Sequence, residues 1–98
     1  QSLIPFVVKL SQNSPNPFNP TTSMYVSVEK ESRGSLVIFN LKGQAVRTLH
    51  KGRLVTGITN FIWDGNDNSG RPVSGGTYIY RLKLDGVSSQ SQKMILLK

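Results

Sequence analysis

Turn-forming residues interrupt this chain at short intervals, which leaves room only for short strands. Gly, Pro, Asn and Ser recur throughout, and the runs between them are rich in Val, Ile, Tyr, Phe and Thr. No window repeats its apolar residues with a helical period. The 98 residues suffice for one domain with one modest core. The pattern predicts an all-β domain, an antiparallel Greek-key sandwich of roughly seven to eight strands without a helix.

The expected strands follow from apolar runs and from alternation of apolar and polar residues. The nearly continuous apolar run Ser35–Leu41 is typical of a central strand that is covered on both faces. We expect strands at Ile4–Leu10, Thr22–Glu29, Ser35–Leu41, Gln44–Leu49, Ile58–Trp63, Gly76–Asp85 and Ser88–Lys98, the last running to the final residue.

Turn chemistry predicts the connections. Ser14–Pro20 contains three prolines, and each lacks the N–H that a central strand needs. We therefore expect a rigid extended crossing anchored by Phe18. The other connections are hairpin turns at Asn40–Gly43 and Asp85-Gly86, a charged turn at Lys30–Gly34, and loops at Lys51–Gly57 and Asp64–Gly75.

Aromatic residues in the alternating strands have two readings. They could line a platform for sugar binding, but an aromatic inside such a strand is more often part of the core. We favour the core, with polar tips of Trp63 and Tyr78 bonded to the backbone. The predicted core is Met24, Val26, Leu36, Ile38, Phe61, Trp63, Tyr78, Tyr80, Leu82, Met94 and Leu96.

The net charge of +7 favours anionic partners. The basic residues are spread along the chain, and their densest cluster is Arg47, His50, Lys51 and Arg53. We interpret that cluster as a solvated strand end. Because no continuous basic stripe or known motif is present, no nucleic-acid partner is expected. The absence of cysteine excludes disulfides and thiolate metal sites.

The loop after Trp63 could bind calcium or could be a network of turns. Asp64, Asn66 and Asn68 alternate as oxygen ligands do at the start of an EF-hand loop, but Ser69 and Gly75 stand where glycine and a bidentate Glu are needed. We favour turns in which Asp and Asn side chains bond nearby amides.

Catalysis is not expected. The chain has one histidine, His50, and no G-x-S-x-G motif. Of its five carboxylates, Glu29 and Glu31 flank Lys30 at an expected turn, and nothing indicates a pair across a cleft. We predict no catalytic, cofactor-binding or metal-binding residues, and no cofactor.

Motifs in a fixed order resemble a known family. The chain resembles the C-terminal sorting domains of type IX secretion cargo in Bacteroidetes and related phyla, and is similar to the immunoglobulin-like domain of the flagellar hook-capping protein. The resemblance covers residues 11–98, and residues 1–10 are a linker or a first strand. The matching motifs are Asn16-Pro17-Phe18-Asn19-Pro20, Trp63-Asp64-Gly65, Asp67, Gly70–Val73, Gly76-Thr77-Tyr78 continuing to Leu82, and Lys93–Lys98.

The resemblance implies an immunoglobulin-like or fibronectin-III-like sandwich without enzyme activity. It implies a monomeric module that directs a larger secreted protein through the periplasm to the exterior or the cell surface. The implied partners are the secretion machinery and sortase proteins of the outer membrane, with anionic lipopolysaccharide as a further partner. Because the chain starts with Gln1, we expect it to be part of a longer protein. The alternative is a spacer module of a secreted enzyme, or a hook-capping-type domain.

The last strand is the predicted recognition element. Its apolar residues fall on both faces between two lysines, which fits either a strand buried on both sides or an exposed strip that a partner covers. The resemblance favours the exposed strip. A partner could add a strand along an edge with unpaired backbone groups. The predicted partner-binding residues are Lys93, Met94, Ile95, Leu96, Leu97 and Lys98.

Overall fold

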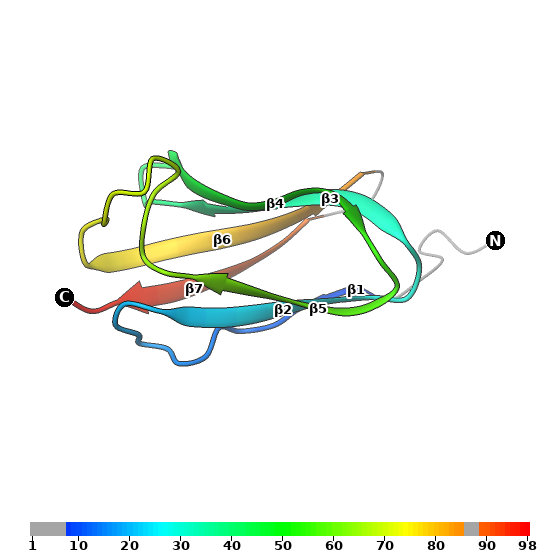
Figure 1. Cartoon of the computed structure of the whole chain (residues 1–98), viewed down its shortest axis with the longest axis horizontal. Coiled ribbons are helices and arrows are strands. Elements are labelled where there is room, and N and C mark those ends of the chain that lie inside the picture. Colours follow the sequence, from blue (N-terminus) through cyan, green and yellow to red (C-terminus); the bar gives the residue numbers. More distant parts are fainter. Residues whose placement is uncertain (1–7, 86–88) are drawn as a thin grey trace.

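Two antiparallel sheets pack face to face (Figure 1). The computed structural model describes residues 8–85 and 89–98. Residues 4–7 of the first predicted strand, Gly86 of a predicted turn and Ser88 of the last predicted strand therefore lie outside it. Within this described part, no helix is long and apolar enough to cross a membrane. The strands are β1 (Val8–Leu10), β2 (Thr22–Val28), β3 (Ser32–Phe39), β4 (Ala45–Leu54), β5 (Gly57–Trp63), β6 (Gly76–Leu84) and β7 (Gln90–Leu96).

Pairing between strands that are not consecutive builds the sandwich. One sheet has the order β1-β2-β5, and the other has the order β4-β3-β6-β7. The chain therefore changes sheets after β2, after β4, after β5 and at no other step before β7. All the strand pairs are antiparallel. This arrangement confirms the prediction of an all-β, immunoglobulin-like sandwich.

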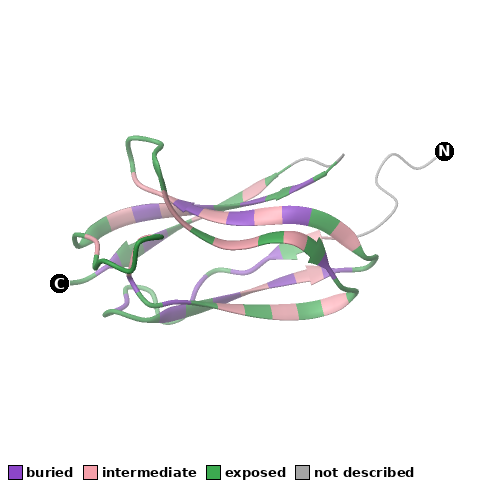
Figure 2. Ribbon diagram, turned by 45° about the horizontal axis from the view of Figure 1, so that its top comes forward, coloured by how far each residue is buried: buried purple, intermediate pink, exposed green. Residues whose placement is uncertain are grey.

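Alternation along the strands separates the core from the two outer faces (Figure 2). In β2, Met24, Val26 and Val28 are buried while the residues between them are not. In β6, the even-numbered residues from Tyr78 to Leu84 are buried. Because side chains in a strand point to opposite faces in turn, each sheet presents one face to the core and one to solvent.

Several predicted boundaries are wrong because the β3–β4 hairpin is longer than its apolar run. β3 begins at Ser32, inside the predicted turn Lys30–Gly34. β4 continues to Leu54, inside the predicted loop Lys51–Gly57. Gly34 permits this extension, because a Cβ there would lie 2.5 Å from the Lys83 carbonyl oxygen of β6.

Two further predictions need correction. β3 is central in its sheet, but only alternate residues are fully buried, so it is not covered on both faces. The last strand stops at Leu96 and does not reach the final residue.

The predicted hairpin turn at Asn40–Gly43 is confirmed, with Gly43 at a φ of 82°.

Ten of the eleven residues of the predicted core are buried in the structure. Phe61 is the exception: it is only half-buried, although it packs against the core from β5. Phe18 is buried, as expected of the anchor of the proline-rich crossing. The core also contains Leu10, Val28, Leu54 and Leu84, which the predicted core did not include.

Trp63 lies at the centre of the aromatic contacts. Its side chain is fully buried, and its ring centroid lies 5.7 Å from that of Phe18 and 5.3 Å from that of Tyr78. The indole N–H donates a 2.8 Å hydrogen bond to the Asn66 carbonyl oxygen. Core packing therefore accounts for Trp63, and the sugar-platform reading does not hold for this residue.

Tyr80 ties the two sheets together. Its buried hydroxyl donates a 2.6 Å hydrogen bond to the Ser11 carbonyl oxygen, just beyond β1. Burial raises the pKa of Tyr80 to about 12, and the backbone N–H of Asn13 opposes part of that rise. Burial likewise raises the pKa of Tyr78, whose hydroxyl donates to the Ser74 carbonyl oxygen.

Replacing Trp63 tests the packing. We expect Trp63→Ala to lower the free energy of unfolding by roughly 3–5 kcal/mol, because it leaves a cavity beside two aromatic rings. Urea unfolding measures the loss. The matched control is Ile62→Ala, since Ile62 is 66% exposed; we expect it to cost under about 0.5 kcal/mol. Equal small costs for both variants would mean that the indole is not buried.

Alkaline unfolding tests the environment of Tyr80. The unfolded chain releases this phenolic proton near its ordinary pKa, whereas the folded chain holds it until about pH 12. Stability from this group is therefore complete below about pH 10 and is lost as the pH rises from about 10 to 12. We expect Tyr80→Phe to flatten this part of the stability profile, measured by urea unfolding at each pH. Identical slopes for the two proteins would contradict the raised pKa.

Candidate functional site

The C-terminal strand β7 has one buried and one exposed face. Met94 and Leu96 are 0% and 2% exposed and belong to the core. Ile95 and Leu97 are 40% and 51% exposed, so they form an apolar pair at the surface. The exposed residues Lys93 and Lys98 stand at either end of this pair. Of the predicted partner-binding residues, Met94 and Leu96 are thus core residues, and the other four are accessible.

The outward edge of β7 is covered by residues 12–18, here named the strap. The Phe18 N–H donates to the Ile95 carbonyl oxygen at 3.0 Å, and the Leu97 N–H donates to the Phe18 carbonyl oxygen at 2.8 Å. The Asn16 Oδ1 accepts a 3.0 Å bond from the Ile95 N–H. Gln12 donates from Nε2 to the Lys93 carbonyl oxygen at 2.8 Å.

These bonds correct the expected mechanism of recognition. A partner was expected to add a strand along unpaired backbone groups of β7, but the strap already bonds both backbone groups of Ile95, the carbonyl of Lys93 and the N–H of Leu97. Strand addition at this edge would require removal of the strap. In this structure a partner can therefore contact β7 through its exposed side chains, chiefly those of Ile95 and Leu97.

Side-chain hydrogen bonds fix the strap to β2. The buried amide of Asn13 donates to the Pro15 carbonyl oxygen at 3.1 Å and to Thr22 Oγ1 at 3.0 Å. The Thr22 hydroxyl in turn donates to the Pro15 carbonyl oxygen at 2.7 Å. Ser14 and Ser23 exchange two backbone hydrogen bonds. The strap is thus held between β2 of one sheet and β7 of the other.

The motifs that were singled out in the sequence meet around this strap. Phe18 contacts Trp63, and its backbone forms a bridge with Leu96. Gly65 has a φ of 81°, and a Cβ there would lie 3.1 Å from the Pro20 carbonyl oxygen. Gly76 pairs with Leu96 across β6 and β7. Asn19 and Pro20 are exposed, as is Asp64, and Asn16 and Pro17 form the outer surface of the strap.

Two glutamines close the gap between β7 and β1. Gln90 accepts from the Leu10 N–H at 3.1 Å and donates to the Val8 carbonyl oxygen at 2.8 Å. Gln92 donates to the Leu10 carbonyl oxygen at 3.2 Å. Neither glutamine was predicted to have a structural role. Their positions in the strand could have indicated one, because Gln90 and Gln92 alternate in step with buried Met94 and Leu96 and are therefore polar residues on an inward face.

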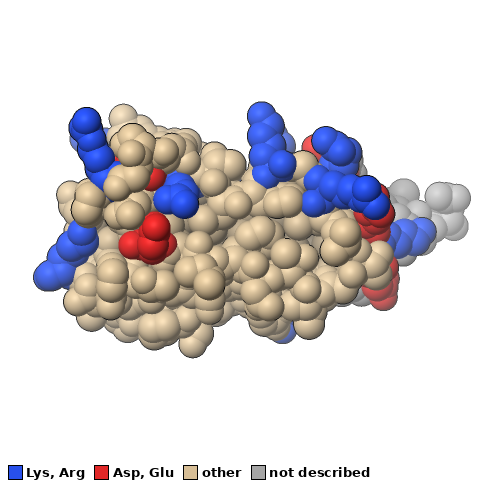
Figure 3. Space-filling view, in the orientation of Figure 1, with Lys and Arg blue, Asp and Glu red and all other residues tan. Residues whose placement is uncertain are grey.

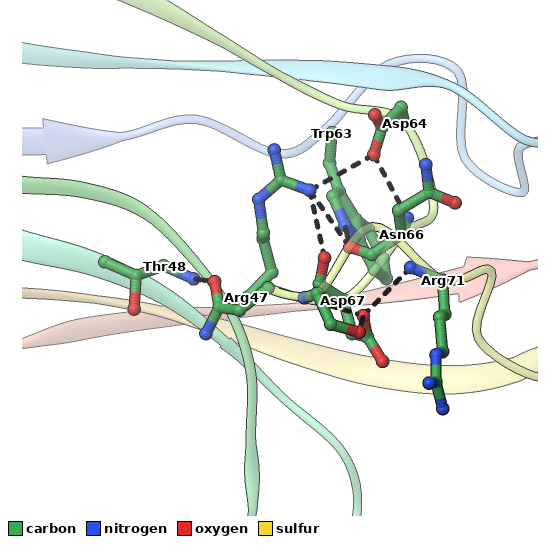
Figure 4. A network of polar contacts seen from close by, with 9 residues as sticks. Arg47, Thr48, Trp63, Asp64, Asn66, Asp67 and Arg71 are labelled. Atoms are coloured by element: carbon green, nitrogen blue, oxygen red, sulfur yellow. Dashed lines mark hydrogen bonds and ion pairs between the residues drawn. The ribbon is translucent and has the colours of Figure 1, made fainter.

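The loop between β5 and β6 is a network of turns (Figure 4). One carboxylate oxygen of Asp67 accepts bonds from the Ser69 hydroxyl and from the N–H groups of Ser69 and Arg71. The Ser69 hydroxyl is the chief cause that lowers the pKa of Asp67, with the Arg71 N–H next. Asn68 accepts from the Thr48 N–H at 2.9 Å, and its own N–H donates to Val46, which caps the edge of β4.

Arg47 supplies the positive charge of this loop. Its Nη1 lies 3.5 Å from Asp64 Oδ1, 3.2 Å from the Asn66 carbonyl oxygen and 3.4 Å from the Asp67 carbonyl oxygen. Asp64 Oδ1 also accepts from the Asn66 N–H. Two of the side-chain oxygens considered as calcium ligands are therefore engaged: Asp64 Oδ1 by Arg47 and the Asn66 N–H, and Asn68 Oδ1 by the Thr48 N–H. This geometry favours the turn network over the calcium loop.

His50 packs against an aromatic ring of the other sheet. Its ring stacks edge-on against Phe61, with centroids 5.5 Å apart, and its buried Nε2 has no hydrogen-bond partner among the described residues. Across residues 8–85 and 89–98, no group of three or more His, Asp or Glu is positioned to hold a metal ion.

The role of Arg47 can be tested by thermal melting. We expect Arg47→Ala to destabilise the domain by about 1–2 kcal/mol, because three loop oxygens lose a charged donor. We expect Lys42→Ala, in the exposed β3–β4 turn, to cost under about 0.5 kcal/mol.

The turn-network reading also predicts how the unchanged protein responds to calcium. Its melting temperatures in calcium and in a chelator should differ by less than about 1 °C. A clear stabilisation by calcium would overturn the turn-network reading.

Three comparisons place this fold among known proteins. The sequence profile of the FlgD Ig-like domain matches residues 13–89. No curated protein sequence matches the chain. The crystal structure of dimeric latent PorU from Porphyromonas gingivalis is similar with a TM-score of 0.74 and 18% identity, over 96% of this chain and 10% of that one.

A second solved structure is similar at a lower TM-score. It is that of PorZ, described as an essential bacterial surface component of the type-IX secretion system of Porphyromonas gingivalis. The TM-score is 0.56 with 17% identity, over 96% of this chain and 12% of that one. The chain thus spans about a tenth of each protein, and at these identities the likeness concerns the fold. The profile match covers most of the sandwich, and on that basis the chain belongs to the FlgD Ig-like domain family.

Proposed function

We propose that this domain is a non-catalytic sorting module that directs a larger secreted protein through the type IX secretion system to the exterior or the cell surface. The observation that carries the proposal is the exposed apolar pair Ile95 and Leu97 between Lys93 and Lys98. Apolar side chains that stay exposed to water lower the solubility of a protein, so a surface of this kind suits a partner that covers it. The proposed partners are the outer-membrane secretion machinery and its sortase proteins.

The strap makes this surface rigid. Because its hydrogen bonds and the buried Phe18 hold the strand at its end, a partner need not order the segment on binding. The lysines supply charge that pairs with carboxylates at the rim of an interface and sets its register. Closure of the edge also keeps copies of the domain from pairing with one another through β7.

A structural role is the second candidate. Membership of the FlgD Ig-like domain family favours it. The match to the family profile ends at residue 89, before β7 begins, so it does not include the residues of the proposed signal. On this alternative the domain is a spacer or a hook-capping-type module, and Ile95 and Leu97 have no partner in secretion.

An export assay separates the two candidates. The domain is fused to the C-terminus of a reporter in a host with type IX secretion. We expect Ile95→Ser with Leu97→Ser to cut export by about tenfold or more and to leave the reporter in the periplasm, because the anchor residues are lost. Lys93→Glu with Lys98→Glu should act in the same direction.

The matched control is Ile58→Ser with Ile62→Ser. These residues are 65% and 66% exposed on the outer face of β5, so this variant removes similar apolar groups elsewhere. Circular dichroism establishes that each variant is folded, which the loss of buried Leu96 in a simple deletion would compromise. Normal export of the folded Ile95/Leu97 variant would contradict the proposed signal. Failure of the unchanged domain to export the reporter would favour the structural role.

A further inference from the structure

The outer face of the four-stranded sheet gathers basic residues that are scattered in the sequence. The pairing register places Arg33 opposite Arg53 and Ser35 between Lys51 of β4 and Lys83 of β6. Figure 3 shows Lys and Arg along the upper margin, on the side of this sheet, and at both ends of the molecule. The lower margin, formed by the three-stranded sheet, is almost free of them.

The fold divides the basic cluster that was noted in the sequence. Lys51 and Arg53 are exposed on the outer face. His50 instead packs on Phe61 between the sheets, and Arg47 reaches into the β5–β6 loop. Alternation along β4 places His50 on the face opposite Lys51, and the register shift between Leu36 and Val37 moves Arg47 out of phase with Lys51 and Arg53. The face is completed by Arg33, Arg81 and Lys83 from other strands, which is why a scan along the sequence found no basic stripe.

Most of this charge is not neutralised within the domain. Arg53 pairs with Glu31 at 2.7 Å, and Arg81 lies over the Phe39 ring with its guanidinium carbon 5.3 Å from the centroid. In the part of the chain that the structure describes, Arg33, Lys51 and Lys83 have no ion pair. Like charges placed on neighbouring strands repel one another, so the row costs stability that a bound anion would restore.

A shallow hollow marks the centre of this charge. It has a volume of about 300 Å³ and is lined by Arg33, Ser35, Lys51, Lys83 and the glycines at 34 and 52, with Asp85 as its one carboxylate. Neighbouring strands lie about 4.8 Å apart, so the backbones bearing Lys51 and Lys83 are roughly 10 Å apart with the Ser35 hydroxyl between them. Two ammonium groups and a hydroxyl thus border a space that fits one charged group of a polymer.

We propose that this face binds an acidic polysaccharide, with a sulfate, phosphate or carboxylate group of the chain seated between Lys51 and Lys83. The polymer class follows from what accompanies the charge. The neutral polar residues among the cations bear hydroxyl groups, which suit a hydroxylated chain. They are Ser35 of β3, Thr48 of β4 and Ser91 of β7. The inference does not rest on the sorting role.

Two other polyanions fit less well. Single-stranded nucleic acid needs free aromatic faces for stacking, and Phe39, the aromatic residue of this face, is half-buried beneath Arg81. A membrane surface is bound best when exposed apolar residues accompany the cations. The three most exposed ones lie elsewhere: Ile58 and Ile62 are on the opposite sheet, and Leu41 is in the β3–β4 turn. Ile95 belongs to the same sheet, but it pairs with Thr77, at the end of β6 remote from Lys83.

The test compares two double charge reversals that change the net charge equally. Lys51→Glu with Lys83→Glu alters the proposed site. Lys9→Glu with Lys42→Glu alters exposed lysines on β1 and in the β3–β4 turn. The probe is dextran sulfate, with neutral dextran of the same length as the blank. Binding is measured by calorimetry on the 98-residue chain, and thermal melting establishes that both variants are folded.

We expect the Lys51/Lys83 variant to bind dextran sulfate at least about tenfold more weakly and with a smaller salt dependence, because two contacts that release counterions are lost. The Lys9/Lys42 variant should lose less than about threefold. Equal losses in both variants, or no binding by the unchanged protein, would overturn the proposed site. Tighter binding to a single-stranded oligonucleotide or to phosphatidylglycerol vesicles than to dextran sulfate would overturn the proposed occupant.

Discussion

The contact between Phe18 and Trp63 is the interaction on which the arrangement of this domain depends. Phe18 comes from a segment whose prolines cannot join a sheet interior, and Trp63 comes from the end of β5. Burial of both rings fixes the strap against the core. A fully buried aromatic side chain contributes roughly 2–3 kcal/mol, which offsets much of the entropy lost when a few strap residues are ordered. The hydrogen bonds to β7 then form with little further loss of conformational entropy.

Closure of the β7 edge links this packing to function. A sheet edge offers free backbone groups to any other chain, and an apolar edge invites aggregation. Here the strap bonds the backbone of Ile95 on its outward side, and Gln90 and Gln92 bond β1. The β4 edge is also partly covered, since Asn68 bonds the Thr48 N–H and the Val46 carbonyl oxygen. In the sorting role that we propose, a partner recognises the side chains of this surface, whose identity can be specific in a way that backbone pairing is not.

The sequence predicted the fold class and ten of the fifteen buried core residues because alternation is a local signal. Tyr78 and Tyr80 could be assigned to the inner face from their spacing alone. The limits of β3 and β4 could not be predicted, because Gly34 and Gly52 resemble turn residues. Only the structure shows that Gly34 lies close against β6 and that Gly52 pairs with Gly34 across the hairpin. The bonded edge of β7 was missed for a related reason. It depends on contacts between residues nearly eighty positions apart, such as Asn16 with Ile95.

Amide hydrogen exchange tests the closure of the β7 edge most directly. The account predicts that the N–H groups of Phe18, Ile95 and Leu97 exchange at least about a hundredfold more slowly than those of an exposed chain. It also predicts that Phe18→Ala removes this protection while the amides between β3 and β6 keep theirs. Exchange of the Ile95 and Leu97 amides at unprotected rates in the unchanged protein would show that the strap does not close the edge.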